Sequence, residues 1–432
     1  MTTTSDKSSN PPTHTATATA GDAPYAIATG HEGTVSQQVS GYFQRVRGGD
    51  MGMLPALAGL VILTILFSAA SPYFLTRLNI ANLLTQTASL MMLSMALVFV
   101  ILLAEIDLSA GVTSGVGMAV FILLNNVTQV SWIWALLAAL LVGALIGSFI
   151  GYFVAKVGVP SFVVTLGLFL GFQGLQLVLL GDGGTYRIQT PEVLAIMNKS
   201  LPVWAGWLMF AVIIGVTLVI ALYDRSRRLR SSAVVRPISL LWIRLAALAI
   251  GAGLVVFMLN QNRSASVIPI QGVPIVVPIA LVILWVGTQV LDRSKFGLHL
   301  YAVGGNPEAA RRAGINVARV RIAAFIICST LAVVSGLFTA SRVGSVEAGS
   351  GRDIVLSGVA AAVVGGVSLF GGRGRLVHAA VGALVISMIT NGLGLLGLPA
   401  GISLLITGGV LVLAATIDAL SRKRAGASLA RT

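Results

Sequence analysis

The sequence has few charged residues for its length. Only 10% of its 432 residues are Asp, Glu, Lys or Arg, whereas 56% are hydrophobic, and the mean hydropathy is +0.93. A soluble chain carries about 25% charged residues, because its surface must face water. The composition therefore excludes a soluble multidomain protein and indicates a chain that lies in a lipid bilayer.

Acidic residues are the scarcer kind of charge. The chain has 14 Asp and Glu against 28 Lys and Arg, which gives a net charge of +14. In a soluble protein such an excess would suggest binding to nucleic acid. Here the cations lie mostly between long apolar runs, where the enrichment of Lys and Arg in cytoplasmic loops explains them. We therefore expect no nucleic-acid partner.

Residues that hold metals, form disulfides or surround nucleotides are also scarce. The single cysteine, Cys328, lies inside an apolar run, and the four histidines are scattered, so no disulfide and no metal site is expected. The chain has no Gly-Lys pair, which excludes the phosphate-binding G-x-x-x-x-G-K-[ST] loop, and it has no G-x-S-x-G or H-E-x-x-H motif. We expect neither enzyme activity nor a cofactor bound by this chain.

Apolar stretches fill most of the sequence. A helix needs about 20 residues to cross roughly 30 Å of hydrocarbon. We predict an all-α polytopic membrane protein with a transmembrane domain over residues 51–420. Its twelve spans are expected near residues 54–71, 83–103, 109–124, 132–155, 161–180, 203–223, 239–259, 274–291, 322–341, 354–370, 376–396 and 400–418. Residues 1–50, rich in Ser, Thr, Ala and Pro, are predicted to be a disordered cytoplasmic tail, and residues 421–432 a short basic one.

The cations sort by loop when the N-terminus is placed in the cytosol. Of the 28 Lys and Arg residues, 22 then lie on the inner side and six on the outer side. The outer six are Arg77, Arg187, Lys199, Arg263, Arg342 and Arg352. A change of one in the span count would destroy this separation, so both termini are predicted to be cytoplasmic.

Glycines repeat at every fourth residue in two of the predicted spans. Gly143, Gly147 and Gly151 share one face of a helix, and Gly167 and Gly171 share a face of the next. Such faces allow helix backbones to approach closely within a bilayer. They predict tight packing of helices inside the bundle.

Two acidic residues, Glu105 and Asp107, interrupt the apolar pattern in FVILLAEIDLSAGVTSG. One interpretation is a cation site at a helix break, which an ion-coupled secondary transporter would use. The other is that Asp107 caps the next helix at a cytoplasmic turn, where its side chain accepts a backbone N–H near Ser109. The position at a predicted membrane face favours the cap.

The inner loop 292–321 contains the signals of a short helix. In order, these are an N-cap, a proline for the first turn, an acid at the positive helix end and a glycine stop, at Asn306, Pro307, Glu308 and Gly314. They predict a helix of about seven residues, ~10 Å long. It would either receive a push from a separate cytosolic protein or lie at the interface with Arg311 and Arg312 in solvent.

Five sequence segments form a recognisable set, in the order AEIDLSAG, VPSFVVTLG, LYAVGGNPEAARRAGI, VVGGVSLFGGRG and NGLGLLG. Together they resemble the membrane-permease subunit of bacterial ABC sugar importers of the ribose, xylose and arabinose group. The resemblance covers roughly residues 50–420. It implies a translocation pathway for a neutral monosaccharide in the bacterial inner membrane.

The resemblance also implies partners. They are a second copy of the chain in a homodimer, a tandem ATP-binding subunit on the cytoplasmic side that uses ATP and Mg, and an extracytoplasmic sugar-binding protein. The ATPase-coupling segment that it implies consists of Gly304, Gly305, Asn306, Pro307, Glu308, Arg311, Arg312 and Gly314.

The chain is longer than ribose-type permeases, which are similar to a ten-span, cobalamin-importer-like plan. Residues of about 224–273 add the basic loop RSRRLRSSAVVR, a span and a further polar loop, so that two spans exceed that plan. The insertion resembles xylose-type permeases. Xylose is therefore the expected substrate, with ribose, arabinose and galactose as alternatives.

Polar residues within or beside the spans are candidates for the sugar pathway, because a neutral sugar needs hydrogen-bonding groups rather than charges. They are Asn82, Gln86, Gln173, Gln176 and Asn391. The competing interpretation is that most of them bond neighbouring helices.

Overall fold

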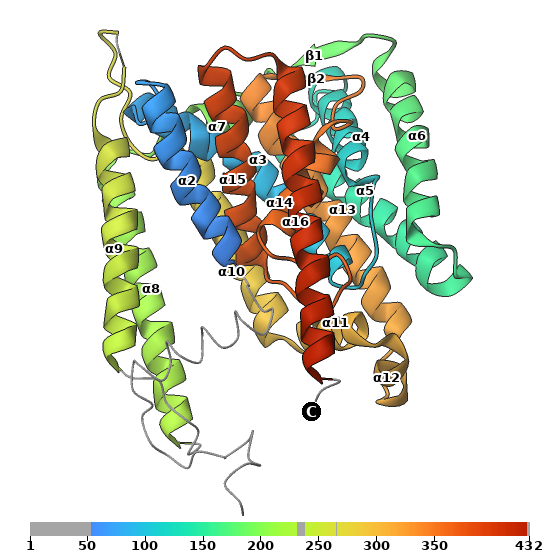
Figure 1. Cartoon of the computed structure of the whole chain (residues 1–432). Coiled ribbons are helices and arrows are strands. Elements are labelled where there is room, and N and C mark those ends of the chain that lie inside the picture. Colours follow the sequence, from blue (N-terminus) through green and yellow to red (C-terminus); the bar gives the residue numbers. More distant parts are fainter. Residues whose placement is uncertain (1–52, 231–237, 265, 430–432) are drawn as a thin grey trace, which may run out of the picture.

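The computed structural model of this protein describes residues 53–230, 238–264 and 266–429 (Figure 1). The tail predicted for residues 1–50 lies outside the described residues, and so do residues 231–237 of the predicted insertion. Side chains near the C-terminal end of the chain are likewise not described, which includes the basic residues predicted for 421–432.

Helices make up nearly all of the regular structure. They are α2 (Leu54–Ala70), α3 (Arg77–Ile101), α4 (Ala110–Ile122), α5 (Trp132–Tyr152), α6 (Ser161–Leu180), α7 (Pro191–Asn198), α8 (Val203–Arg230), α9 (Ile238–Asn260), α10 (Val276–Arg293), α11 (Lys295–Gly305), α12 (Pro307–Arg312), α13 (Val317–Val343), α14 (Ile354–Val364), α15 (Leu376–Leu395) and α16 (Ala400–Leu429). Short π-helical segments, Leu123–Val127 and Phe153–Val157, extend α4 and α5.

Each of the twelve predicted spans coincides with a helix. In the described part of the chain, nine helices are long and apolar enough to cross a membrane. The shorter apolar helices Leu54–Ala70, Ile354–Val364 and Ala400–Thr416 correspond to the other three spans. The predicted helical, multi-pass membrane fold is confirmed.

The structure differs from the prediction at the tenth span. The apolar run 354–370 is helical only as far as Val364, because Gly365 packs against the His378 carbonyl and Gly366 takes a left-handed φ of +104°. A Cβ at Gly365 would overlap that carbonyl oxygen. The Gly-Gly pair is a local signal for a turn, but Val367, Leu369 and Phe370 continue the apolar run beyond it.

A second difference is a small antiparallel sheet in the otherwise helical chain. β1 (Thr185–Arg187) pairs with β2 (Ser345–Glu347) in the register Thr185↔Glu347 and Arg187↔Ser345. The sheet joins the loop after α6 to the loop after α13. We use it to name one end of the bundle, the sheet end, and α12 to name the other, the α12 end (Figure 1).

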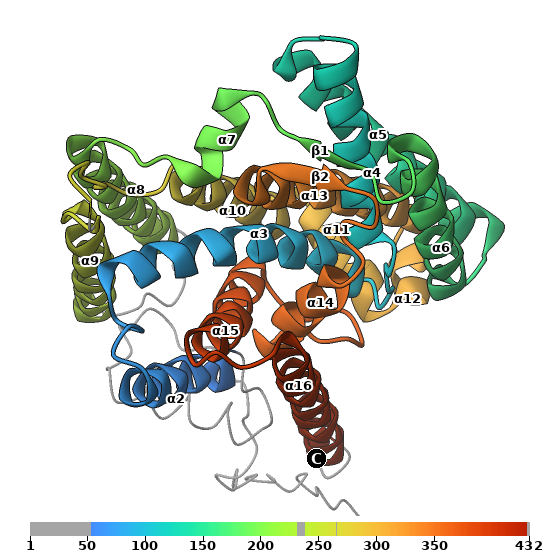
Figure 2. The same ribbon diagram turned by 90° about the horizontal axis from the view of Figure 1, so that it is seen from above.

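Helices α3 and α13 form the centre of the bundle. Of the most apolar window of α3, 72% is buried, and the largest fully buried side chains include Met92 and Phe99 of α3 and Phe325 and Phe338 of α13. Helix α5 packs on α13, while α14 and α15 pack on α3. Viewed along the bundle, α3 and α13 lie between these neighbours (Figure 2).

The helices α8 and α9 form a hairpin at the edge of the bundle (Figures 1 and 2). Only 6% of the most apolar window of each is buried. The hairpin meets the bundle near the sheet end, where Val256 and Leu259 of α9 cluster with Ala81 of α3 and with Val273. This peripheral place is the one that two spans added to a complete bundle would occupy.

Several cations in the described part of the chain lie at the end of the bundle where the predicted loops place them. At the sheet end, Arg187 lies in β1, Arg77 donates to the Asn262 carbonyl (3.2 Å) and Arg263 donates to Ser200 Oγ (2.6 Å). The basic ends of α8 and α12 lie at the other end (Figure 1). The excess of cations at the α12 end predicts that this end faces the cytosol.

One of the two glycine faces packs as predicted. A Cβ at Gly147 would lie 2.6 Å from Ile326 Cα, and one at Gly151 would lie 2.7 Å from Ile322 Cα, so α5 rests directly on the backbone of α13. Gly167 and Gly171, in contrast, have nothing within 4 Å of such a Cβ among the described residues. The face on α6 therefore packs on no helix within the described part of the chain.

This difference predicts unequal effects of one substitution. Gly147→Leu should destabilise the protein by about 1–3 kcal/mol, because the added side chain overlaps the backbone of α13. Gly167→Leu makes the same change in helix propensity on an exposed face and should leave stability near wild type. The measurement is the melting temperature of each purified variant in detergent, and equal melting temperatures for the two would contradict the packing of α5 on α13.

Candidate functional site

The short helix α12 is built as the sequence predicts. Asn306 Oδ1 accepts from the backbone N–H groups of Glu308 and Ala309, each at 3.0 Å, and Pro307 occupies the first turn. Glu308 pairs with Arg311 at 3.1 Å and with Arg312 at 3.4 Å. The chain leaves the helix through Gly314, whose φ of +83° is left-handed. The helix has six residues, close to the seven predicted.

Helix α12 protrudes from the α12 end of the bundle (Figure 1). The side chains of Arg311 and Arg312 are 67% and 80% exposed, and only Ala310 is buried against the bundle. The Arg and Glu side chains thus remain accessible to a second protein. Their mutual ion pairs contribute little stability at this exposure, so the Asn306 cap and Pro307 are the main local features that stabilise the helix.

Helix α11, which precedes α12 and was not predicted from the sequence, joins it to the core. A Cβ at Gly304 would overlap the carbonyl oxygen of Leu102, which follows α3. The same carbonyl accepts a hydrogen bond from the N–H of Gly372 at 2.8 Å. The segment after α3, helix α11 and the loop before α15 are far apart in the sequence, yet they meet at the Leu102 carbonyl. Gly304 and Gly372 can approach it closely because neither has a side chain.

Tyr301 makes a further bond between α11 and the loop before α15. Its hydroxyl donates to the Gly374 carbonyl at 2.6 Å, while Asp292 and Arg375 form a nearby ion pair at 3.9 Å. Burial, followed by the charge of Asp292, raises the pKa of Tyr301 to about 12. The hydroxyl therefore stays protonated and able to donate at physiological pH.

An ion pair joins the start of α13 to the break between α3 and α4. Arg321 Nε lies 3.3 Å from Glu105 Oε1, and the two side chains are 27% and 13% exposed. Both residues belong to segments that the topology places on the inner side. Since α13 begins a few residues after α12, this pair is a second connection between α12 and the centre of the bundle.

Asp107 lies in the interior and not at an exposed turn. Its residue is 1% exposed, and its Oδ1 accepts from the Ser109 N–H (2.9 Å) and the Ser109 hydroxyl (2.6 Å). Its Oδ2 accepts from Cys328 Sγ of α13 at 3.7 Å. The predicted bond to a backbone N–H near Ser109 is present. The turn that the sequence predicts at the cytoplasmic face is buried, because α13 and α6 cover the break.

The rest of the break is held by α6. Ser161 Oγ accepts from the Ile106 N–H at 3.2 Å, and Thr165 Oγ1 donates to the Ile106 carbonyl at 3.2 Å. Ala104 has a left-handed φ of +59°, which costs about 1 kcal/mol for a residue with a Cβ.

Residues 53–230, 238–264 and 266–429 contain no group of three or more His, Cys, Asp or Glu that could hold a metal ion.

Two of the five candidate pathway residues take part in helix packing. Gln176 is fully buried, where it donates to the Val112 carbonyl (3.1 Å) and accepts from the Gly349 N–H (3.2 Å). Asn391 exchanges two amide hydrogen bonds of 2.9 Å with Asn79 of α3. These bonds agree with the alternative interpretation, in which Gln176 and Asn391 bond neighbouring parts of the chain and do not line a pathway.

The other three candidates have side chains that form no hydrogen bond with the described residues. Asn82 and Gln86 lie one turn apart on α3, exposed and half-buried respectively, and Gln173 is half-buried on α6. Among the described residues, no hydrogen bond links the side chain of Gln173 to that of Asn82 or Gln86. A role of these three residues in a pathway stays a prediction.

Sequence reasoning missed three partners that the fold supplies, namely Asn79, Arg321 and Cys328. A signal existed for Arg321, since Glu105 and Arg321 carry opposite charges in segments predicted for the same membrane face. No sequence signal pairs Asn79 with Asn391 or Cys328 with Asp107, because each pair is separated by more than 200 residues.

The sequence of the chain matches a known family of transport proteins. The family described as "Branched-chain amino acid transport system / permease component" matches residues 79–415, which is most of the chain and runs from within α3 into α16. The chain belongs to this permease family. The resemblance inferred from the sequence is thereby confirmed at the level of a membrane permease.

Individual relatives cover nearly the whole chain. The xylose transport system permease protein XylH of Haemophilus influenzae is 31% identical over 379 residues, which are 86% of this chain and 96% of that protein. The XylH protein of Escherichia coli K12 is 31% identical over 402 residues, 89% of this chain and 96% of its own. The ribose import permease protein RbsC of Bacillus subtilis is 32% identical over 370 residues, 86% of this chain and 94% of its own. No solved structure matches the chain.

The Glu105–Arg321 pair predicts a stability effect that a swap should reverse. Glu105→Gln or Arg321→Gln leaves one poorly hydrated charge without its partner, so each should lower the free energy of unfolding by about 1–3 kcal/mol. Glu105→Arg combined with Arg321→Glu should recover part of that loss.

Thermal melting of the purified variants measures these effects. Glu308→Gln is the control, since it removes exposed ion pairs worth at most about 1 kcal/mol. If the swap loses as much stability as the two single losses added together, with no recovery, the pair does not connect α13 to the break.

Proposed function

We propose that this chain is the permease subunit of an ATP-driven importer and forms the translocation pathway for a neutral monosaccharide. The observation that carries the proposal is α12, a capped and exposed helix whose flanking helices contact the core through Gly304 of α11 and the Arg321–Glu105 pair of α13. A helix of this kind suits contact with a separate motor. The printed activities of the relatives, xylose and ribose permeases, supply the substrate class.

The motor would be a separate tandem ATP-binding subunit that uses ATP and Mg at the cytoplasmic side. Its closure moves α12, and the motion reaches the break between α3 and α4 through the Leu102–Gly372 contact and through Arg321. Two copies of the chain then change between inward-facing and outward-facing arrangements as packed bodies. The proposed residues of the ATPase contact are those of the segment from Gly304 to Gly314.

A sugar-binding protein would deliver the substrate at the sheet end. That end then faces the outside of the inner membrane and both chain termini face the cytosol, in agreement with the distribution of cations. Arg187 and Lys199 lie at this end and would meet acidic groups of the binding protein.

Xylose is the preferred substrate. The proposal rests on the insertion of about residues 224–273, which contains α9 and by which the sequence resembles xylose-type permeases, with ribose, arabinose or galactose as alternatives. The spans contain hydrogen-bonding amides such as Asn82 and Gln86 and almost no charge, which suits a neutral solute.

An ion-coupled secondary transporter is the rival function, with Glu105 and Asp107 as its coupling site. No observation favours it. Glu105 pairs with Arg321, and Asp107 is occupied by Ser109 and Cys328. Both carboxylates thus already have partners within the chain.

Reconstitution tests the proposal directly. The permease in liposomes with its ATPase and sugar-binding protein should accumulate xylose only when ATP is inside with the ATPase, and xylose with its binding protein should stimulate ATP hydrolysis. A panel of ribose, arabinose and galactose ranks the substrates. Uptake driven by a proton or sodium gradient without ATP and without the ATPase would refute the importer and support the rival.

The coupling assignment predicts the effect of reversing one charge. Glu308→Lys removes both ion pairs of α12 and places a cation at the positive end of its helix, so ATP hydrolysis should continue while xylose uptake falls at least about tenfold. Glu192→Lys makes the same change on α7 at the sheet end and should leave assembly with the ATPase unaffected. Normal uptake by the Glu308→Lys complex would exclude α12 as the coupling element.

A further inference from the structure

The loop between β2 and α14, residues 348–353, turns back into the bundle, and we call it the re-entrant loop. Gly349 and Gly351 have left-handed φ values of +100° and +90°, which glycine adopts without strain. A Cβ at Gly351 would overlap the carbonyl oxygen of Gly111, near the start of α4. The Gly349 N–H donates to Gln176 of α6 at 3.2 Å. The loop is therefore packed on the backbone of α4 and held by α6.

The tip of the re-entrant loop lies about halfway between the two ends of the bundle. Helix α14, which follows it, has 11 residues and is about 16 Å long, half the thickness of the hydrocarbon core. A Cβ at Gly358 would lie 3.0 Å from both Leu93 Cγ and Leu97 Cδ1, past the middle of α3. One turn earlier, Arg352 and Asp353 therefore lie opposite the middle of α3. The loop belongs to an outer segment of the predicted topology, yet its tip enters the bilayer.

Arg352 and Asp353 carry opposite charges on an open face of the bundle. Both residues are exposed, and in residues 53–230, 238–264 and 266–429 neither side chain forms a hydrogen bond or an ion pair. Leu356, on the first turn of α14, is 60% exposed, although α14 packs on α3, α15 and α16. One face of α14 and the tip of the loop are thus left uncovered by the described part of the chain.

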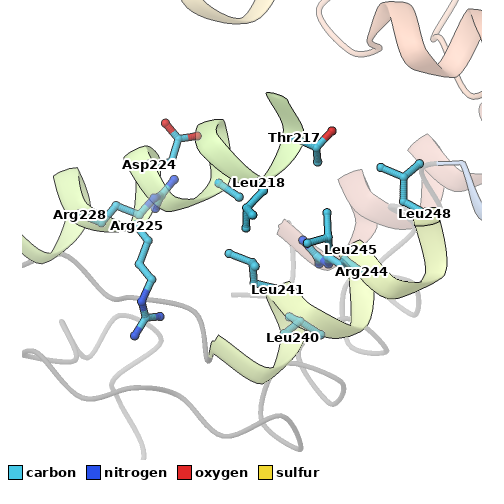
Figure 3. Close-up of a pocket in the computed structure, with 11 residues that line it drawn as sticks. Thr217, Leu218, Asp224, Arg225, Arg228, Leu240, Leu241, Arg244, Leu245 and Leu248 are labelled. Atoms are coloured by element: carbon cyan, nitrogen blue, oxygen red, sulfur yellow. The ribbon is translucent and has the colours of Figure 1, made fainter. Parts of the chain in front are cut away.

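Charge in a membrane helix ordinarily lies near the helix end. Figure 3 shows this beside the hollow between α8 and α9, where Arg225 and Arg228 occupy the last two turns of α8. At mid-depth, a charge that faces hydrocarbon is strongly unfavourable, and irregular backbone occurs only where protein buries it or where it lines a water-filled cavity. Since Arg352 and Asp353 are exposed, the tip of the re-entrant loop borders water and not lipid.

A water-filled space at the middle of a permease is its pathway, so the inference rests on the proposed function. We propose that Arg352 and Asp353 bind the hydroxyl groups of the monosaccharide as it crosses the middle of the membrane. The Asp353 carboxylate accepts hydrogen bonds from sugar hydroxyls, and the Arg352 guanidinium donates to hydroxyl oxygens. The two adjacent charges cancel, so the site gives no advantage to a cation or an anion. A zwitterionic amino acid would also satisfy both charges, which makes it the necessary competitor in a test.

Xylose uptake by the complex with its ATPase and sugar-binding protein in liposomes tests this role. Asp353→Asn and Arg352→Gln should each lower the uptake rate at least about tenfold, because each removes charge-assisted hydrogen bonds to the sugar. Asp182→Asn and Arg77→Gln make the same changes near the sheet end and should import xylose at the wild-type rate. The wild type should also prefer xylose to its deoxy analogues, and Asp353→Asn should narrow that preference.

The outcomes separate this inference from the proposed function. A wild-type complex that imports leucine instead of xylose, or no sugar at all, would contradict the proposed function itself. A wild-type complex that imports xylose, with Asp353→Asn and Arg352→Gln equally fast and equally selective, would contradict only the role of the re-entrant loop. Both variants should melt at the wild-type temperature, because neither side chain bonds to the described part of the chain.

Thiol labelling tests the water-filled space without transport. Asp353→Cys in liposomes should react with a charged, membrane-impermeant methanethiosulfonate supplied on both sides, because a thiolate forms only in water. Leu141→Cys, at a position that is 60% exposed on α5, should face lipid and stay unlabelled. The wild type is the blank, since its single cysteine, Cys328, is buried. An unlabelled Asp353→Cys variant would show that lipid or a second copy of the chain covers the loop, and would overturn the proposal.

Discussion

The absence of water in a bilayer is the constraint on which this structure depends. Every backbone N–H and C=O at membrane depth must find a partner within the chain, and a helix meets that demand locally. The break between α3 and α4 cannot do so. Its backbone groups are satisfied by protein instead, through Ser161, Thr165, Gly372 and the side chain of Asp107. Irregular backbone is present here because other helices cover it.

The same demand explains why the break and the coupling segment are joined. The Leu102 carbonyl, freed at the end of α3, is met by Gly372, and Gly304 packs directly on it. If only lipid covered the break, no protein contact would connect the break to α12. Because protein supplies the partners, α12, the glycine-rich loop before α15 and the centre of the bundle share one contact region. Movement of α12 in the proposed function must therefore disturb the break.

Much of the fold could be predicted because bilayer thickness imposes a length that apolar composition reveals. The twelve spans and the cap of α12 follow from local rules, since Asn306, Pro307 and Glu308 act within one turn of each other. Helix α11 and the early end of α14 did not follow. The turn at Gly365 and Gly366 depends on the close approach of α15 at His378, a contact that no local pattern contains.

The sequence by itself determined that this chain crosses a membrane many times, where its cations collect, and that a short capped helix stands between two spans. These properties depend on composition and on neighbours within a few residues. Only the tertiary structure decided which polar groups meet: Glu105 with Arg321, Asp107 with Cys328, Asn79 with Asn391. The reason is physical, because in lipid each buried polar group takes the partner that helix packing brings within reach, and packing joins residues hundreds of positions apart.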